Sequence, residues 1–360
     1  MHRFARLLRD GLTARGLETL LLRPKCRVVP APTGVAHWRN RFEKFIFEQR
    51  LRAMRGGEFD IIHVTDQGNA VYAELIKRSG IPSIVTCHDL SVLEEQAQRR
   101  GLWQRQLEAR MRRGFRAASL VICDSEFTRG VFRHVVGDAT ASRVVYIGAQ
   151  RSYRRIEPAE AADRLRDKRL TPGSFLLHVG AGYARKNRPL LVRILAGVSS
   201  QCQLHLVLAG DPADTELLDL ASRLDCRDRV LSVPQPTDDV LEALYSNAHA
   251  LLFPSLYEGF GWPIIEAQSC GCPVVCSNAT CLPEIGGDGA LFHDPMDAAA
   301  ASEHVLALSD PNVRDPLVQR GHRNAARFSP DQMLDGYVGA YDAVLAKSFP
   351  LSGRPAVAHK

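Results

Sequence analysis

The sequence predicts an α/β protein of two domains, each built on a parallel β-sheet that helices cover. Short apolar runs typical of buried strands alternate along the chain with amphipathic segments typical of helices. The length of 360 residues suits two domains, at the usual size of roughly 150 residues each. A charged segment at 149–172 ends in Thr-Pro-Gly and separates the two sets of elements. We therefore expect two Rossmann-like domains that face each other across a cleft.

The first domain is expected at residues 1–165 and begins with a helical pattern at Phe4–Ala14. Doubly wound domains normally open with a strand, a tight glycine turn and then a helix. We therefore predict that this sequence lacks the first strand of the sheet and its glycine turn. Further strands are predicted at Glu18–Leu22, Asp60–Val64, Ser83–Cys87, Leu120–Cys123 and Arg143–Ile147. Further helices are predicted at Arg41–Met54, Ala70–Arg78 and Leu102–Ala117.

The second domain is expected at residues 166–330 and repeats the alternation of strands and helices. Its strands are predicted at Phe175–Val179, His205–Ala209, Val230–Val233, Ala250–Phe253, Pro273–Cys276 and Ala290–Phe292. Its helices are predicted at Pro189–Val198, Thr215–Leu224, Asp238–Ser246, Pro263–Ser269 and Ala298–Leu308.

The composition excludes several classes of protein. Gly and Pro, at 27 and 20 residues, are near average, so a fibrous or disordered chain is excluded. No stretch approaches the roughly 18 apolar residues of a membrane-spanning helix. The N-terminus is charged from its third residue and lacks the apolar core of a secretory signal.

The positive charge is concentrated in the N-terminal part of the chain. Residues 1–172 carry 32 Lys and Arg against 19 Asp and Glu, whereas residues 173–360 carry 14 Lys and Arg against 21 Asp and Glu. Such an asymmetry indicates an anionic partner on the N-terminal side or, alternatively, merely solvated helix faces. Nucleic acid is the weaker choice, because no nucleic-acid-binding motif is present and the aromatic residues do not interleave with the arginines. An anionic membrane surface or a lipid diphosphate is the partner we expect.

Nine cysteines without a signal peptide indicate reduced thiols in a cytoplasmic protein. Cys270, Cys272, Cys276 and Cys281 lie close together in the sequence, so a metal site must be considered. Their spacing lacks the paired C-x2-C knuckles of structural zinc sites. We therefore predict that they are small apolar core residues rather than metal ligands.

The segment from Ser255 to Glu266 is the most informative motif of the sequence. It follows the predicted strand Ala250–Phe253, and ligands bind at the carboxyl ends of strands in open α/β sheets. Its glycines allow close approach of the backbone to a ligand, and Pro263 suits the first turn of a helix. Glu258 and Glu266 could accept hydrogen bonds from sugar and ribose hydroxyls. The alternative is that both carboxylates are merely exposed charges.

The second motif, Val179–Asn187, also follows a strand and precedes a helix. Its adjacent Arg185 and Lys186 could neutralise a diphosphate. A dinucleotide fingerprint is excluded because only G-x-G is present. A solvated basic turn is the alternative.

Two further candidates follow strands of the first domain. His88 directly follows the strand Ser83–Cys87 and could contact a reacting sugar, or it could be structural. Ser125 follows Leu120–Cys123 and is most simply the N-cap of the next helix. A contact of Ser125 with the acceptor or a phosphate is the alternative.

Together these motifs resemble those of glycosyltransferase family 4, retaining enzymes of the two-domain GT-B fold that use nucleotide sugars. The resemblance is strongest in Leu241–Pro295, with its Glu-x7-Glu element, its Cys-Gly-Cys-Pro-Val-Val strand and its Leu-Pro-Glu-Ile turn. The Arg-Lys-Asn, His-Asp and Asp-Ser-Glu-Phe-Thr motifs also fall in the family's order. These variants look most like bacterial mannosyltransferases of polysaccharide and lipopolysaccharide assembly.

The resemblance implies a role for each residue of the second domain's motifs. Arg185 and Lys186 would hold the donor diphosphate as the leaving group, and Glu266 would bind the ribose. Glu258 and the amides of Phe260 and Gly261 would bind the donor sugar. The resemblance implies GDP-mannose as the first donor to test and no metal or other cofactor, since the cations and a helix N-terminus stabilise the charge.

From the first domain, His88 would contact the donor sugar near the reacting carbon. The acceptor would be a glycan or a lipid-diphosphate-linked sugar, reached at the inner face of the cell membrane. A helix at 331–347 would cross back to the first domain, leaving a flexible tail at 348–360. Because the family begins with a strand and a Gly-Gly turn that this sequence lacks, the alternative is a truncated pseudoenzyme or interaction subunit without turnover.

Overall fold

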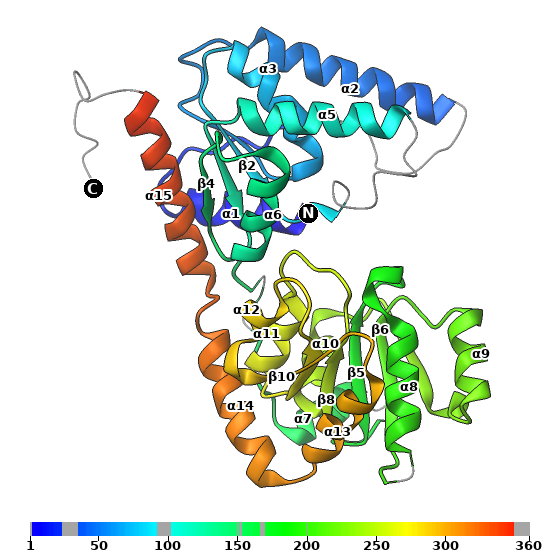
Figure 1. Cartoon of the computed structure of the whole chain (residues 1–360). Coiled ribbons are helices and arrows are strands. Elements are labelled where there is room, and N and C mark those ends of the chain that lie inside the picture. The colour runs from blue at the N-terminus through cyan, green and yellow to red at the C-terminus, as the bar shows by residue number, and fades with distance from the viewer. Residues whose placement is uncertain are drawn as a thin grey trace. The chain divides into compact units, whose positions relative to one another are not determined.

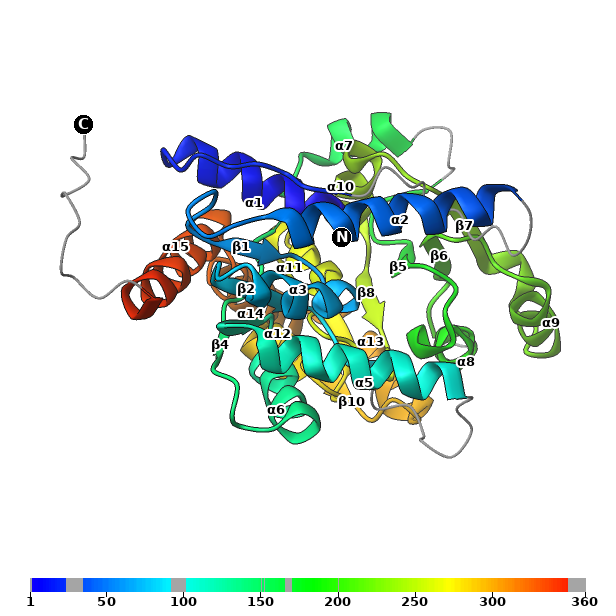
Figure 2. The same cartoon turned by 90° about the horizontal axis from the view of Figure 1, so that it is seen from above.

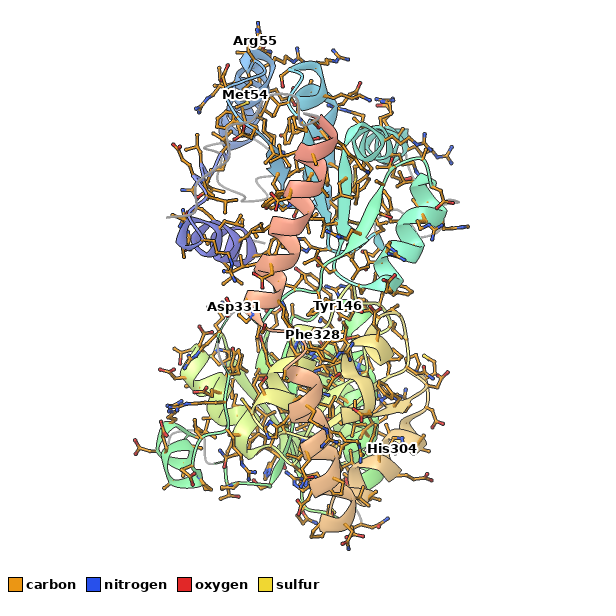
Figure 3. The ribbon with its side chains drawn as sticks, turned by 90° about the vertical axis from the view of Figure 1, so that its left-hand side faces the viewer. Met54, Arg55, Tyr146, His304, Phe328 and Asp331 are labelled. Carbon is orange, nitrogen blue, oxygen red and sulfur yellow. The ribbon has the colours of Figure 1, made fainter. Side chains whose placement is uncertain are left out.

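The structure of the chain, a computed structural model, describes residues 2–23, 35–91, 102–149, 151, 153–165, 170–199 and 201–348. It divides into two compact units, which we describe separately (Figure 1). Unit 1 comprises residues 1–146 and 331–360, and unit 2 comprises residues 147–330. The chain leaves unit 1 after Tyr146 and returns to it at Asp331, both labelled in Figure 3.

The first boundary therefore lies nearly twenty residues before the predicted one at 165. The segment expected to be a linker contains helix α7 (Pro158–Leu165), which packs against α10 (Asp238–Asn247) of unit 2. Arg164 lies 3.1 Å from the buried carboxylate of Glu242, and Ala161 and Leu165 are buried. These contacts assign α7 to unit 2. Of the tail predicted at 348–360, all but Ser348 lies outside the described residues.

Unit 1 contains a parallel sheet with the strand order β1-β2-β3-β4. Its strands are β1 (Ile62–Val64), β2 (Ser83–Cys87), β3 (Leu120–Cys123) and β4 (Ser142–Val144). Its helices are α1 (His2–Ala14), α2 (Val35–Ala53), η1 (Gln67–Tyr72), α3 (Ala73–Arg78), α5 (Leu102–Ala117), α6 (Glu126–Val136) and α15 (Pro330–Ser348).

The two faces of this sheet are covered by different helices. Alternate residues of β2 and β3, among them Val85 and Val121, belong to a core that α2, α3, α5 and α6 complete. Figures 1 and 2 show α2, α3 and α5 side by side on this face. On the opposite face Thr86 meets the Tyr337 hydroxyl at 3.2 Å, and His63 meets that of Tyr341 at 2.9 Å. Helix α15 is therefore fastened to unit 1 by hydrogen bonds as well as by packing.

The predicted strand Glu18–Leu22 is wrong, because this segment has no regular secondary structure. A strand is stabilised by hydrogen bonds to a neighbouring strand, and among the described residues this segment pairs with none. Two leucines that the apolar pattern placed in the core, Leu20 and Leu21, are exposed. The strand predicted at Arg143–Ile147 begins one residue earlier, at Ser142, and ends at Val144.

Unit 2 contains a parallel sheet with the strand order β10-β9-β8-β5-β6-β7. Its strands are β5 (Phe175–Gly180), β6 (His205–Gly210), β7 (Val230–Pro234), β8 (Ala250–Phe253), β9 (Val274–Ser277) and β10 (Ala290–His293). Besides α7 and α10, its helices are η4 (Ala184–Lys186), α8 (Arg188–Val198), α9 (Thr215–Arg223), η5 (Arg227–Arg229), α11 (Trp262–Ser269), α12 (Leu282–Gly286), η6 (Gly287–Gly289), α13 (Ala298–Ala307) and α14 (Pro311–Ala325).

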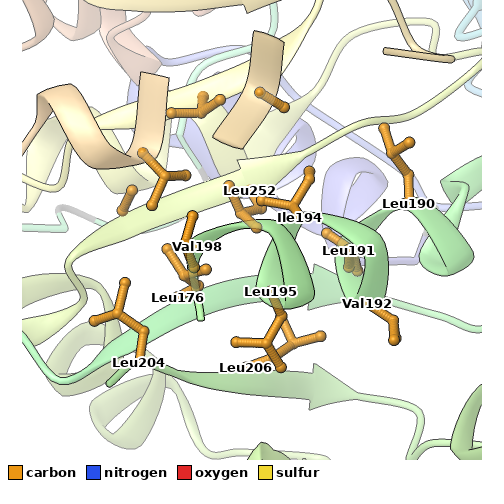
Figure 4. Close-up of a cluster of buried hydrophobic side chains, with 14 of the residues drawn as sticks. Leu176, Leu190, Leu191, Val192, Ile194, Leu195, Val198, Leu204, Leu206 and Leu252 are labelled. Carbon is orange, nitrogen blue, oxygen red and sulfur yellow. The ribbon is translucent and has the colours of Figure 1, made fainter. Parts of the chain in front are cut away.

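The core of unit 2 is built on alternate strand residues and the apolar side of α8. Figure 4 shows Leu191, Ile194 and Leu195 of α8 against Leu176 and Leu252 of the strands. The intervening strand residues are buried too, so both faces of the sheet are covered. Among the described residues no helix is both long and apolar enough to cross a bilayer.

The four neighbouring cysteines of unit 2 are buried thiols. Burial raises the pKa of Cys272 to about 12, and no disulfide joins any of the four. Cys276 lies within β9, whereas Cys270 and Cys281 flank helices. In the described ranges no group of side chains has the arrangement of a metal site. As predicted, these residues are part of the core.

Candidate active site

Three segments of unit 2 lie at the carboxyl ends of β5, β8 and β9, which are neighbours in the sheet. The first runs from the end of β5 to α8 and carries Arg185 and Lys186. The second, residues 254–261 and here named the donor loop, joins β8 to α11 and carries Glu258. The third, residues 278–281, joins β9 to α12. Because parallel strands end at one edge of a sheet, the topology brings these segments together.

Arg185, Lys186 and Glu258 form one cluster of charges. Arg185 Nη1 donates a hydrogen bond of 2.9 Å to Glu258 Oε2, and Lys186 Nζ lies 2.7 Å from Glu258 Oε1. The Lys186 and Glu258 side chains are about nine-tenths buried, whereas Arg185 is more exposed. The cluster keeps a net positive charge, so it can attract an anion such as a diphosphate.

Backbone hydrogen bonds fix the first segment against the donor loop. The Leu256 amide donates to the Arg185 carbonyl at 2.8 Å, and Arg185 Nη1 donates to the Tyr257 carbonyl at 3.1 Å. Asn187 adopts a left-handed conformation with a φ of 53°, and its Nδ2 donates to the carbonyls of Pro254 and Pro295. The Arg-Lys-Asn motif therefore contributes two cations and an amide that ties the surrounding loops.

The end of the donor loop has the backbone that its sequence predicted. Gly261 has a φ of 105°, which favours glycine, and α11 begins directly after it with Pro263 in its first turn. Phe260 is buried, and its ring meets that of Phe328 edge-on at 5.7 Å. Phe260 therefore anchors the loop with its side chain, which leaves the sugar contact that the resemblance implied to its backbone.

Glu266 lies on α11 and is half-buried. Its Oε2 accepts a hydrogen bond of 2.9 Å from the hydroxyl of Tyr245, which is fully buried on α10. Burial and the neighbouring carboxylate raise the pKa of Tyr245 well above 10, so its hydroxyl remains a donor. Tyr245 was not predicted for the site, because an aromatic residue at helical spacing indicates a position in the hydrophobic core.

Thr280 and Cys281, in the third segment, form hydrogen bonds to the backbone of the donor loop. Thr280 Oγ1 accepts a hydrogen bond of 3.2 Å from the Glu258 amide. The Cys281 thiol donates towards the carbonyls of Glu258 and Phe260, at 3.3 and 3.1 Å. Neither residue was predicted for the site, and the only sequence signal for them is their position after a predicted strand.

In unit 1, His88 is paired with Asp124, which directly follows β3. Nδ1 of His88 lies 2.6 Å from Asp124 Oδ2, and Nε2 lies 3.1 Å from the carbonyl of Thr65. The ring of Phe4 meets the imidazole edge-on at 4.9 Å. A carboxylate and a carbonyl only accept hydrogen bonds, so this arrangement favours protons on both ring nitrogens. Asp124 is a further residue, after Tyr245, Thr280 and Cys281, that was not predicted for the site.

The pKa values of this pair follow from burial and mutual charge. Burial lowers the pKa of His88, but the charge of Asp124 and the hydrogen bond to it raise it above 6.5 on balance. Burial raises the pKa of Asp124 above 3.8, although the nearby histidine opposes that shift. Both groups therefore hold protons more tightly than in an unfolded chain.

Ser125 is the N-cap of α6, as the simpler of its two interpretations predicts. Its Oγ accepts a hydrogen bond of 3.1 Å from the Thr128 amide, and its side chain is fully buried. This burial does not favour the alternative, a contact with the acceptor or a phosphate. Of the predicted site residues, the structure brings Arg185, Lys186 and Glu258 into contact, places Phe260 and Gly261 in the same loop as Glu258 and Glu266 on the helix that follows, and places His88 and Ser125 in unit 1.

Comparison with known proteins places both units in described families. Residues 1–151 match the model of Glycosyltransferase Family 4, and residues 163–324 match that of Glycosyl transferases group 1. The O-antigen chain mannosyltransferase B of Escherichia coli is 32% identical over 266 residues, which cover 72% of this chain and 70% of that protein. The chain belongs to glycosyltransferase family 4. It is thus a glycosyltransferase.

Two other relatives of this family 4 chain match it over a smaller part of their own length. The serotype-specific mannosyltransferase WbdA of Escherichia coli is 35% identical over 180 residues, 48% of this chain and 22% of that protein. A D-inositol 3-phosphate glycosyltransferase of Salinispora arenicola is 30% identical over 239 residues, 60% of this chain and 53% of that protein. Both matches are partial.

Solved structures show that the fold of this family 4 glycosyltransferase is GT-B. A sucrose-phosphate synthase from Thermosynechococcus elongatus superposes with a TM-score of 0.75 at 22% identity, covering 96% of this chain and 93% of that one. Anabaena HepE, in complex with UDP and glucose, gives a TM-score of 0.71 at 19% identity, with coverages of 86% and 83%. At these identities the likeness concerns the fold alone.

Proposed function

We propose that the chain transfers a hexose, mannose in the first instance, from GDP-mannose to a glycan or lipid-linked acceptor in the synthesis of a cell-surface polysaccharide. The observation that carries this proposal is the cluster of Arg185, Lys186 and Glu258 at the carboxyl ends of β5 and β8. Mannose is supported by the names of two relatives, which are mannosyltransferases of Escherichia coli.

The proposed chemistry assigns a charge or hydrogen bond to each step. Arg185 and Lys186 neutralise the diphosphate while the bond between the anomeric carbon and the phosphate oxygen breaks. The acceptor oxygen bonds to the same face of that carbon, so configuration is retained, and its proton passes to the leaving phosphate. Glu258 accepts hydrogen bonds from the sugar and Glu266 from the ribose. His88 contributes to transfer from unit 1.

In this proposal no metal is needed, because two side-chain cations and the N-terminus of α11 supply the positive charge. Transfer should therefore persist in excess chelator. A loss of transfer in EDTA that Mg²⁺ or Mn²⁺ restores would contradict this part of the proposal.

The acceptor is proposed to be lipid-linked and reached at the anionic inner face of the cell membrane. Supporting this, α2 carries two exposed apolar residues, Phe45 and Ile46, next to the exposed Lys44, and apolar side chains near a cation suit a bilayer interface. Sedimentation with vesicles of phosphatidylglycerol and phosphatidylcholine should capture the protein and weaken as salt rises. Equal binding to neutral vesicles, or binding that salt leaves unchanged, would count against this surface.

The central experiment is turnover of a panel of nucleotide sugars by purified protein, followed by mass spectrometry of the released nucleotide and the product. We expect GDP-mannose to be consumed and Glu258→Ala to lose at least tenfold in kcat/KM. Glu303→Ala, an exposed position on α13, is the matched control and should behave as wild type. A donor that protects against thermal unfolding without any turnover would instead support a pseudoenzyme or interaction subunit.

A further inference from the structure

Thr280 has a backbone conformation that threonine rarely adopts. Its φ is 57°, in the left-handed region, where the β-branched side chain crowds the backbone. Glycine would adopt this conformation without strain. Strained residues of this kind persist where the surroundings enforce them, and they cluster at functional sites. The presence of a threonine rather than a glycine at this position therefore indicates that its side chain has a role.

The Thr280 hydroxyl is bonded to the backbone of the residue that carries the proposed sugar contact. Its Oγ1 accepts from the Glu258 amide at 3.2 Å. The carboxylate of the same Glu258 forms the ion pairs with Arg185 and Lys186. The hydroxyl therefore fixes Glu258 at its main chain, while the two cations fix it at its side chain.

The neighbours of Thr280 support the same loop. The Cys281 thiol donates towards the carbonyls of Glu258 and Phe260, and the Ser277 hydroxyl donates to the Ser255 carbonyl at 2.5 Å. Three side chains between 277 and 281 thus hold the donor loop at several backbone atoms. Of the three, only Thr280 is at a positive φ and only Thr280 accepts from the Glu258 amide.

We propose that Thr280 is a positioning residue for donor-sugar binding. It is held in a strained conformation so that its hydroxyl sets the main chain of Glu258. This inference rests on the proposed role of Glu258 and goes beyond it, because Thr280 acts through Glu258 and needs no contact with the sugar itself. It predicts that the hydroxyl, rather than the size or the branching of the side chain, is what transfer requires.

Three substitutions separate these properties. Thr280→Ser keeps the hydroxyl, Thr280→Val keeps the branching without it, and Thr280→Gly removes both the hydroxyl and the strain. One neutral hydrogen bond corresponds to roughly a threefold to tenfold change. We expect the Val and Gly variants to lose about that much kcat/KM with the nucleotide sugar, and the Ser variant to stay within about twofold of wild type. Affinity for the free nucleoside diphosphate should be unchanged in all three.

Thermal stability distinguishes a positioning role from a merely structural one, because a merely structural role predicts that activity and stability are lost together. Thr280→Gly should unfold close to the temperature of wild type, because relief of the strain offsets the lost hydrogen bond to the Glu258 amide, and still lose activity. Asp225→Gly is the matched control. Asp225 is an exposed residue with a φ of 53° in the turn after α9, so the same backbone relief there should leave kcat/KM unchanged.

A second readout does not depend on turnover. Hydrogen–deuterium exchange of the peptide containing the Glu258 amide should quicken in the Val and Gly variants and stay slow in Ser. If wild type turns over no donor, the proposed function fails, whereas the exchange result still tests the link between Thr280 and Glu258. The inference is overturned if Gly is as active as wild type, if Ser is as impaired as Gly, or if exchange is the same in all variants.

Discussion

Lys186 and Glu258 form an ion pair of 2.7 Å in which both side chains are about nine-tenths buried. The ammonium also lies 4.7 Å from the centre of the Phe253 ring, so its other side faces an aromatic residue. A buried charge is tolerated only when a partner compensates for its lost hydration. Each of the two charges therefore depends on the other. Glu258 depends less on Lys186 than Lys186 does on Glu258, because Arg185 also pairs with the Glu258 carboxylate.

We predict that Lys186→Met lowers the free energy of unfolding by about 1–3 kcal/mol, the cost of an unsatisfied buried polar group, because Glu258 keeps a single, more exposed cation. The double variant with Glu258→Gln should recover part of that loss, because the uncompensated charge is then gone. Urea unfolding followed by tryptophan fluorescence measures both. Arg185→Gln is the control and should cost less, since its side chain is 39% exposed and solvent already screens it. An equal or larger cost for Arg185→Gln would refute this ranking.

The pairing of His88 with Asp124 predicts the direction of a pH dependence in unit 1. The groups around His88 are Asp124, the Thr65 carbonyl, Asp66, the ring of Phe4 and the lowered-pKa His63. Because the pKa of His88 is raised above 6.5, its contribution to stability is complete below 6.5. It is lost as pH rises through the higher pKa of the folded state. The raised pKa of Asp124 acts in the same direction, whereas the lowered pKa of His63, about 3, acts in the opposite direction, because the unfolded chain still binds a proton at this histidine up to about pH 6.5.

The test compares wild type with Asp124→Asn between pH 6 and pH 9. We expect the thermal midpoint of wild type to exceed that of the variant most at pH 6 and the difference to shrink as pH rises, because the histidines with lowered pKa values are common to both proteins. The imidazole of His88, followed by NMR, should titrate at a lower pH once the carboxylate is gone. An unchanged His88 titration in Asp124→Asn would show that the pair does not control its protonation.

The hydrogen bond between Tyr245 and Glu266 predicts a selective effect on donor binding. Tyr245→Phe removes the hydroxyl at 2.9 Å from Glu266 Oε2 and keeps the ring that packs in the core. Losing one such bond costs about 1 kcal/mol, so KM for the nucleotide sugar should rise about fivefold with little change in kcat. Tyr337→Phe removes a comparably buried hydroxyl in unit 1 and serves as the control. A similar rise in KM for both variants would mean that the effect is general.

Much of the site could be predicted from the sequence, because both charged motifs follow strands and parallel strands end at one edge of a sheet. The ion pairing of Glu258 with both cations could not be, since it depends on side-chain directions that spacing does not fix. Thr280 was missed for a related reason. A glycine there would have indicated a left-handed backbone, whereas a threonine after a strand indicates nothing of the kind. The error at Glu18–Leu22 arose because an apolar run predicts burial only where a neighbouring strand exists to pair with it.

Two helical glycines of unit 1 make opposite predictions for the same substitution. A Cβ on Gly114 of α5 would lie 2.0 Å from the carbonyl oxygen of Ala70, whereas Gly130 of α6 has nothing within 4 Å of that position. Gly114→Ala must push α5 away from η1, and such overpacking costs typically 1–3 kcal/mol. Gly130→Ala relieves only the entropy cost of an exposed helical glycine and should gain roughly 0.5–1 kcal/mol. Thermal unfolding of both variants measures the difference. If Gly114→Ala were as stable as Gly130→Ala, the close contact between α5 and η1 would be wrong.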